Sequence, residues 1–224
     1  MSSRDNALWL QFWRDHRTDF HQKAVNQLLK RFWPGLNSVS GSRVFVPLCG
    51  KSLDMLWLAG QGHEVVGVEL SPVAVRAFFR ENRLQPVRRQ QGKFTVWQHG
   101  NISIWCGDFF SLLPVDLGHI DLVYDRASLT ALPEDVRKLY VTHLRSILPQ
   151  TITFFLLTAE DADETGAPAL PGEIDAEIAG LFSADFDIDL THAESVFEPN
   201  PGSADQTDVA TEYKVYRLSS KSRE

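Results

Sequence analysis

VFVPLCGKS at residues 44–52 and EVVGVE at residues 64–69 are the two apolar runs that decide the fold of this 224-residue chain. Both are short and rich in β-branched side chains, so each is predicted to be a buried strand. The first ends near Gly50 and the second ends at Glu69, and a helical pattern over 71–81 follows directly. An alternation of strand and helix therefore begins here.

The same alternation continues toward the C-terminus. Further strands are expected at 94–97, 102–105, 121–124, 151–158, 186–190 and 212–218, and further helices at 53–60, 134–148 and 173–182. Near-continuous apolar strands separated by helices indicate a mostly parallel sheet that is covered on both faces. The predicted fold class is α/β, doubly wound.

Length and composition favour one domain, 1–224, because 43% hydrophobic residues in a chain of this size fill one substantial core. The formal charge of −7 offers no basic field for nucleic acid or an anionic membrane, so a small-molecule partner is expected. No apolar window is long enough to span a membrane. The two cysteines lie in apolar runs, which favours reduced thiols and a cytoplasmic protein.

Ligands of doubly wound sheets bind beyond the carboxyl ends of the strands, where the strand order reverses. That rule selects the residues just after the predicted strands, which are Leu48 to Ser52, Glu69, Asp108 and Asp125-Arg126. These positions are the candidate site.

Gly50, Lys51 and Ser52 also resemble the end of a phosphate-binding loop, but that loop needs a glycine where this chain has Phe45. The glycine-rich dinucleotide fingerprint is missing too, because only Gly50 stands at this turn, and a dehydrogenase is disfavoured. Cys49 is interpreted as a small buried residue rather than a nucleophile.

Glu69 follows Gly50 by 19 residues, the spacing at which an acid in Rossmann-like sheets accepts hydrogen bonds from ribose hydroxyls. An ordinary surface carboxylate is the alternative. A ribose site without a phosphate cradle points to S-adenosylmethionine and hence to methyl transfer. Asp108 then either approaches the adenine amino group or caps the short turn that follows it.

The N-terminal segment 1–37 is predicted to hold two helices, at 5–17 and 21–33, that form a lid over the cofactor. Trp9 and Trp13 lie four residues apart on one helical face. The indoles can be ordinary core, or they can close over an aromatic ligand and supply a cation–π partner for a sulfonium. Both interpretations stay open for Trp9.

Taken in order, several motifs make the chain resemble a bacterial-type thiopurine S-methyltransferase across residues 8–158. They are Trp9-x-x-x-Trp13, Phe20-His-Gln22, Val46-Pro-Leu-Cys-Gly-Lys-Ser52, Gly62-His-Glu-Val-Val-Gly-Val-Glu69, Gly100-Asn-Ile102 and Tyr124-Asp-Arg126. The resemblance implies a seven-stranded Rossmann-like methyltransferase sheet and an enzyme that uses S-adenosylmethionine. It also implies a monomeric, cytoplasmic, metal-free protein, with cofactor contacts from Trp13, Leu48, Glu69 and Arg126.

The acceptor is expected to be a small aromatic or heterocyclic thiol, with selenium or tellurium anions as further candidates. Arg126 is either a surface ion-pair partner of Asp125 or a group that orients an anionic sulfur. Phe20 and His21 either line the acceptor side or form a helix-start staple. Such thiols ionise readily, so a dry pocket that aligns the reacting atoms is needed more than a strong base.

Two segments depart from the family pattern. Residues 166–172 read GAPALPG and carry no aromatic, and 199–212 contain no lysine or arginine. The natural acceptor is therefore open. The alternatives are a sibling methyltransferase for halide, thiocyanate or other thiols, and a cofactor-binding protein that has lost catalysis.

Overall fold

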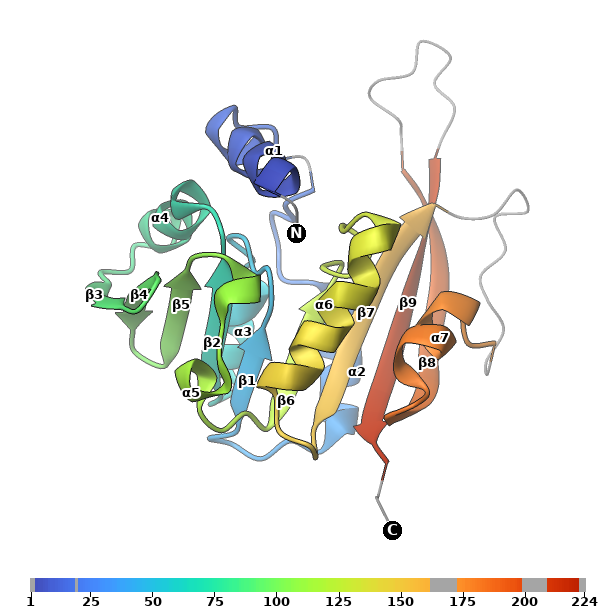
Figure 1. Ribbon diagram of the computed structural model, residues 1–224. Coiled ribbons are helices and arrows are strands. Elements are labelled where there is room, and N and C mark those ends of the chain that lie inside the picture. The colour runs from blue at the N-terminus through green and yellow to red at the C-terminus, as the bar shows by residue number, and fades with distance from the viewer. Residues whose placement is uncertain (1–2, 19, 162–172, 199–208, 222–224) are drawn as a thin grey trace. The chain divides into compact units, whose positions relative to one another are not determined.

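The computed structural model describes residues 3–18, 20–161, 173–198 and 209–221 (Figure 1). The chain divides into two compact units. The first unit comprises Met1–Tyr124 with Thr142–Pro149, and the second comprises Asp125–Val141 with Gln150–Glu224. Each unit is described by itself.

A sheet with the order β3-β4-β5-β2-β1-β6 forms the centre of the first unit. Its parallel part consists of β1 (Arg43–Val46), β2 (Glu64–Glu69) and β5 (Ile102–Cys106), and β6 (Leu122–Arg126) starts beside β1. Two antiparallel strands, β3 (Val87–Gln91) and β4 (Phe94–His99), continue the sheet beyond β5. Because β1, β2 and β5 are parallel, their carboxyl ends share one edge of the sheet.

Helices α4 and α2 of the first unit begin where the sequence supplies a capping side chain. The Ser71 hydroxyl accepts from the Ala74 amide at 3.3 Å and Pro72 opens α4 (Pro72–Glu81), as predicted. The second N-terminal helix is shorter than predicted. Asn26 caps it by accepting from the Leu28 amide at 2.9 Å, so α2 spans Gln27–Phe32 only.

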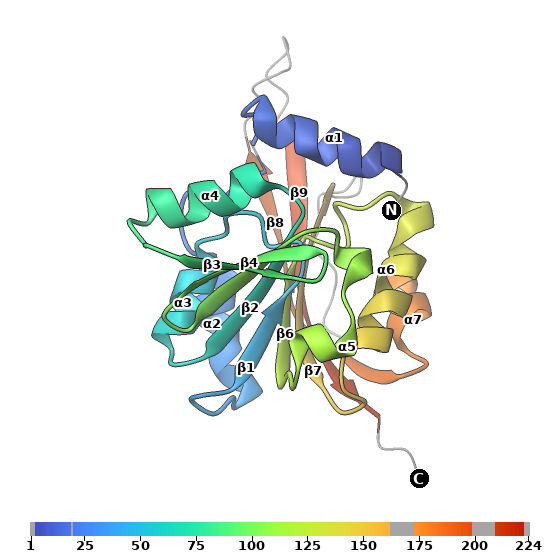
Figure 2. The same cartoon turned by 60° about the vertical axis from the view of Figure 1, so that its left-hand side comes forward.

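The other helical segments of this unit are α1 (Ser3–Arg14), the 3₁₀ turn Trp33–Leu36, α3 (Asp54–Gly60), the 3₁₀ turn Phe109–Ser111, α5 (Pro114–Leu117) and the end of α6 (Glu134–Ile147). Both side views show α1 lying along α4 (Figure 2). Helix α4 also packs on β2 and β5. The N-terminal helix is thus part of the first unit's packing.

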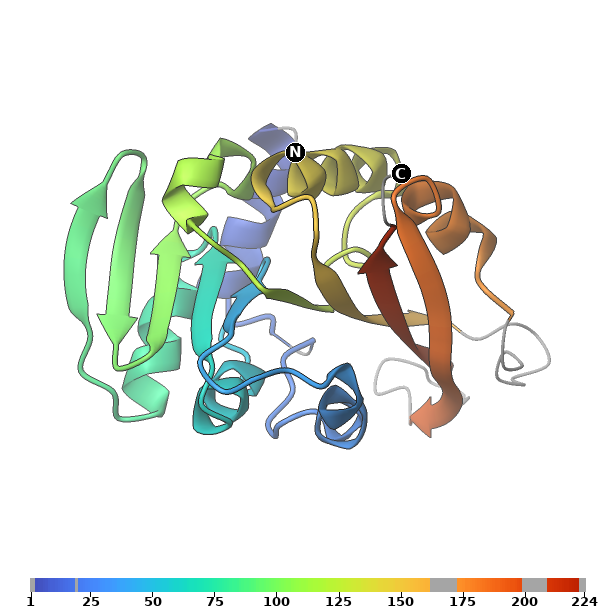
Figure 3. The ribbon, with the colours of Figure 1, turned by 90° about the horizontal axis from the view of Figure 1, so that it is seen from below.

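The second unit is built on three long strands in the order β7-β9-β8 (Figure 3). The strands β7 (Thr153–Asp161) and β8 (Phe186–Glu198) both pair antiparallel with β9 (Val209–Ser220). Helix α7 (Ala176–Phe182), capped by Asp175, packs Phe182 against Phe154 and Phe186 at ring-centroid distances of 6.2 and 6.0 Å. These three aromatic rings are part of the buried core of the second unit.

The α/β class is confirmed, but the described residues form nine strands where seven were expected. Strand β3 was missed. Segment 166–172 and most of 199–212 lie outside the described residues. No described helix combines the length and the apolar character that a membrane span requires.

Candidate functional site

The site begins at the turn after β1. Leu48 and Gly50 both take left-handed backbone conformations, with φ of +45° and +53°. The Cys49 amide between them donates to the Val68 carbonyl of β2 at 2.9 Å. A left-handed leucine is strained by about 1–2 kcal/mol, and strain of this kind is found mainly at functional sites. The hydrogen bond from the Cys49 amide to β2 holds the turn in this strained conformation.

Glu69 at the end of β2 is bound to this turn. Its Oε2 accepts from the Gly50 amide at 2.9 Å, and its Oε1 accepts from the Ser71 amide at 2.6 Å. The side chain is only 6% exposed. A carboxylate has about four acceptor positions, so each oxygen keeps capacity for one further donor. The predicted pairing of a lone-glycine bend with an acid on the adjacent strand is present.

Burial raises the pKa of Glu69 to about 7, and the amide hydrogen bonds from Ser71 and Gly50 offset only part of that effect. The carboxyl group therefore titrates near neutral pH. Donors that favour its ionised form would lower this pKa again.

Trp13 of α1 covers the glycine bend. A methyl group built on Gly50 would lie 3.2 Å from the indole Cζ2 of Trp13, which is closer than most real contacts. Trp13 is only 4% exposed, and its ring meets Phe20 edge to face at 5.4 Å. Phe20 contacts Trp9 in the same way at 5.6 Å. The three aromatic candidates form one cluster, in which Trp13 reaches the bend.

Asp108 caps the 3₁₀ turn after β5, because its Oδ1 accepts from the Phe110 amide at 3.0 Å. Its Oδ2 is free of that role and accepts from Asn6 Nδ2 of α1 at 3.2 Å. The Gly107 amide donates to the Glu69 carbonyl at 2.9 Å, which ties this loop to the end of β2. The capping interpretation is correct, and it leaves one carboxylate oxygen for another donor.

His143 supports the same loop from α6. Its Nε2 lies 3.0 Å from the Phe109 carbonyl, and because a carbonyl only accepts, Nε2 carries the hydrogen. Burial lowers the pKa of His143, which keeps the ring neutral. The ring also packs on Phe109 at 4.9 Å. His143 thus positions the backbone around Asp108.

Asn6 is the site residue that the sequence did not reveal. Its Oδ1 is buried and accepts no hydrogen bond from the described part of the chain, while Nδ2 is held by Asp108. A buried acceptor without a partner is unfavourable unless a ligand supplies the donor. The available signal was its spacing of seven residues from Trp13, which places both on one face of α1.

The two thiols and Lys51 take structural roles. Cys49 Sγ packs against Gly67, where an added methyl would lie 2.7 Å from the sulfur. Burial raises the pKa of Cys49, and it raises that of Cys106 to about 11, with Glu69 adding to both shifts. Both remain thiols at neutral pH. Lys51 Nζ pairs with Glu81 of α4 at 2.8 Å.

The remaining candidates are Arg126 and His21. Arg126 ends β6 in the second unit, where it is half-buried. Its neighbour Asp125 is buried and accepts from the Tyr140 hydroxyl at 2.7 Å and from the Ser128 amide at 3.1 Å. Burial raises the pKa of Asp125. His21 is half-buried, and its backbone N–H donates a hydrogen bond to the Thr18 carbonyl at 2.8 Å.

A family model and two individual relatives place this chain in the same family. The family model "Thiopurine S-methyltransferase" matches residues 4–221. A thiopurine S-methyltransferase of Stutzerimonas stutzeri is 57% identical over 221 residues, which are 99% of this chain and 93% of that protein. One of Pseudomonas putida F1 is 42% identical over 95% of this chain and 98% of its own.

Two solved structures with similar folds are methyltransferases. An S-adenosylmethionine-dependent methyltransferase from Anabaena variabilis superposes with a TM-score of 0.62 at 16% identity, covering 96% of this chain and 95% of its own. The Burkholderia thailandensis 1,6-didemethyltoxoflavin-N1-methyltransferase, solved with S-adenosylhomocysteine, gives 0.61 at 16% identity, covering 97% and 87%. At this identity the likeness concerns the fold.

Proposed function

The chain belongs to the thiopurine S-methyltransferase family and is an S-adenosylmethionine-dependent S-methyltransferase, and we propose that Gly50 and Glu69 hold the adenosine of its cofactor. The observation that carries the proposal is the 2.9 Å bond between the Gly50 amide and Glu69. It fixes a carboxylate with unused acceptor positions beside a glycine backbone, over which the Trp13 indole lies.

The described residues fit the rest of the cofactor. Glu69 would accept from the ribose hydroxyls, while Trp9, Trp13, Leu48 and Asp108 would surround the base and the sulfonium. The adenine amino group carries two hydrogens and needs acceptors. Two acceptors are at hand: Asp108 Oδ2, which can accept a second hydrogen bond, and the unpartnered Oδ1 of Asn6. The two residues are 102 positions apart in sequence but are joined by one hydrogen bond.

When bound, the cofactor supplies an electrophilic methyl group on a positively charged sulfur. The chain's contribution is to exclude water and to hold the acceptor in line, because opposite charges of thiolate and sulfonium cancel during transfer. No strong general base is required for acceptors that are already ionised at neutral pH. We assign Arg126 the role of orienting the anionic sulfur, together with a cofactor contact, on the strength of the family motif Tyr124-Asp-Arg126.

The proposed acceptors are small aromatic or heterocyclic thiols, with Phe20 and His21 on the acceptor side. The ring of Phe20 is exposed and packs edge to face against both indoles, which supports the proposal that the acceptor is aromatic. Selenium and tellurium anions are further proposed acceptors. We also propose that residues 1–224 act as one domain, with 1–37 as its lid, in a cytoplasmic monomer that binds no nucleic acid.

The test is a calorimetric titration with S-adenosylhomocysteine, NAD and ATP, followed by methyl-transfer assays on 6-mercaptopurine, thiocyanate and selenite. We expect binding of S-adenosylhomocysteine alone and turnover of the aromatic thiol. Turnover of thiocyanate only would assign the sibling activity. Binding without any turnover would identify a cofactor-binding protein that has lost catalysis.

A further inference from the structure

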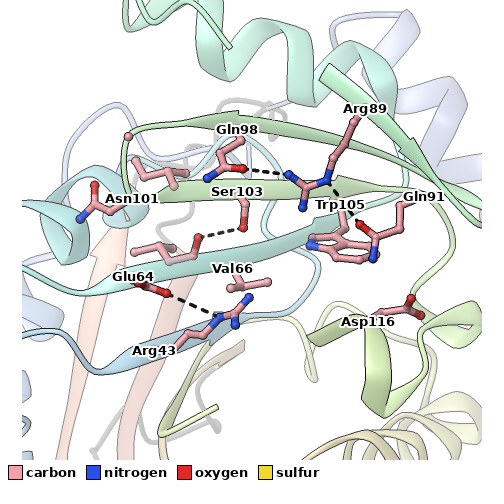
Figure 4. Close-up of a pocket in the computed structure, with 13 residues that line it drawn as sticks. Arg43, Glu64, Val66, Arg89, Gln91, Gln98, Asn101, Ser103, Trp105 and Asp116 are labelled. Carbon is pink, nitrogen blue, oxygen red and sulfur yellow. Dashed lines mark hydrogen bonds and ion pairs between the residues drawn. The ribbon is translucent and has the colours of Figure 1, made fainter. Parts of the chain in front are cut away.

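A hollow lies in the first unit beside the start of β2 (Figure 4). Its cavity volume is about 220 Å³. It is lined by the start of β2 at Glu64 and Val66, whereas Glu69 at the other end of β2 belongs to the candidate site. Along β2, Val66 and Glu69 are three residues apart, roughly 10 Å at 3.3 Å per residue.

The lining side chains share one face of the sheet. In the strand register Arg43 lies beside Glu64, Val66 beside Ser103, Ser103 beside Gln98, and Arg89 beside Val96. Directly paired residues point to the same face, and successive residues along a strand alternate. Arg88 therefore points to the opposite face, where its guanidinium lies 5.0 Å from the Trp97 ring.

The hydrogen bonds of Arg89 fix the orientation of two glutamines. Its Nη1 donates to Gln98 Oε1 at 2.9 Å and its Nε donates to Gln91 Oε1 at 3.4 Å. A guanidinium can only donate, so both amides must turn their oxygen toward Arg89. Their NH₂ groups are left as donors at the hollow, so Arg89 converts two neutral side chains into donors.

Arg43 contributes a second cation from the other side of the hollow (Figure 4). Its Nε is buried and makes no hydrogen bond to the described residues, and the nearest carboxylate oxygen, on Glu64, is 3.9 Å away. That separation is an ion pair without a hydrogen bond. The Arg43 guanidinium thus keeps donor capacity for a ligand.

Two carboxylates, of Glu64 and Asp116, also line the hollow. Neither uses up the hydrogen-bond donors of Arg43, Arg89 and the two glutamines. Glu64 is largely exposed, with 64% of its side chain accessible, so its attraction for Arg43 is weakened by solvent. Asp116 uses Oδ2 to accept from the Leu113 amide at 2.9 Å. The buried indole of Trp105 adds an apolar surface to the same hollow.

We propose that this hollow binds a small oxyanion, a carboxylate or phosphate group on a compact metabolite, between Arg89 and Arg43. Two guanidinium groups and two amide NH₂ groups match the acceptor oxygens of such a group. The volume lies below the range of pockets for drug-sized ligands, which limits the ligand to a few heavy atoms beyond the anionic group.

The test follows the Trp105 indole N–H by ¹⁵N NMR, with its resonance assigned through Trp105→Phe. Inorganic phosphate and succinate are titrated separately, which distinguishes the two kinds of oxyanion. We expect one of them to produce a saturable shift in the wild-type protein and in Arg88→Gln. Arg89→Gln should weaken that binding at least tenfold, and Glu64→Gln should tighten it severalfold by removing the competitor for Arg43.

Arg88→Gln is the matched control because it removes the same charge from the same strand on the other face. The affinity for S-adenosylhomocysteine should stay unchanged in both arginine variants, which keeps this test separate from that of the cofactor site. Absence of a saturable wild-type shift with either anion would overturn the proposal. Equal weakening in the two arginine variants would do the same, since it would reflect net charge alone.

Discussion

Burial and hydrogen bonding act in opposite directions on the Glu69 carboxyl group. Burial favours its protonated form, while the Gly50 and Ser71 amides favour its ionised form. With a pKa near 7 the group is half-ionised at neutral pH in the free protein. The pKa of Glu69 is higher in the folded protein than in the unfolded chain. The protonated Glu69 therefore contributes its full stabilisation below about pH 4.5, and this stabilisation is lost as the pH rises through 7.

The first prediction concerns the pH dependence of cofactor binding. Ribose hydroxyls donate to the ionised carboxylate, so the affinity for S-adenosylhomocysteine should rise between pH 5.5 and about 7.5, with a midpoint near 7. Calorimetry on Glu69→Gln should show a flat profile over this range. Glu64→Gln, at the exposed start of the same strand, should keep the wild-type profile.

Replacing Glu69 by alanine should weaken binding of S-adenosylhomocysteine by about 1–3 kcal/mol, the cost of leaving hydroxyl partners unmet. The measurement is the change in Kd at pH 7.5, with thermal unfolding recorded to show that the variant is folded. An unchanged Kd in a folded variant would remove the ribose assignment.

Gly50 has both a left-handed backbone and the contact with Trp13. Gly50→Ala should therefore lower the free energy of unfolding by about 1–2 kcal/mol and also weaken cofactor binding. Gly92→Ala is the matched control, because Gly92 has φ of +54° and open space around its Cβ. Denaturant unfolding should show a loss for both, at least as large for Gly50→Ala because of the contact with Trp13, whereas calorimetry should show weaker binding only for Gly50→Ala.

At the scale of elements, α1 acts as a clamp with two contact points in the first unit. Trp13 reaches the bend after β1, and Asn6, about two turns earlier, reaches Asp108 after β5. The sequence predicted the helix and its two indoles. It could not predict Asn6, because a single polar residue on a helix carries no sign of the partner it meets 102 residues away.

The clamp leads to a prediction about base recognition. Asn6→Ala should weaken binding of S-adenosylhomocysteine more than binding of S-inosylhomocysteine, in which a carbonyl replaces the 6-amino group that Asn6 Oδ1 is proposed to accept from. Gln11→Ala, on an exposed position of α1, should affect neither ligand. Equal losses for both ligands in Asn6→Ala would show that the residue only supports the helix.

Strand β3 and helix α2 show where element prediction failed. Strand β3 has the sequence VRRQQ, which lacks both the apolar alternation and the β-branched content of a typical strand. It is almost wholly exposed. It forms because β4 offers it a pairing edge. The helical pattern before α2 was extended too far because the capping role of Asn26 was not recognised.

For the whole molecule, the order of strands and helices was predictable because each buried run is bounded by a cap, a proline or a glycine. The division into two units and the full length of β8 and β9 were not. Their polar parts, such as His192 to Ser195, carry no apolar pattern and are strand residues only through pairing with β9. The prediction of Cys49 as a small buried residue is confirmed, but its packing against Gly67 of the neighbouring strand was not predictable.

The most direct test of the cofactor site is a crystal structure of the protein with S-adenosylhomocysteine bound. We expect both ribose hydroxyls within hydrogen-bonding distance of the Glu69 carboxylate, the Gly50 backbone beneath the ligand, and the adenine amino group facing Asn6 and Asp108. A ligand bound elsewhere, or a ribose that leaves Glu69 bonded only to the amides of Gly50 and Ser71, would contradict this expectation.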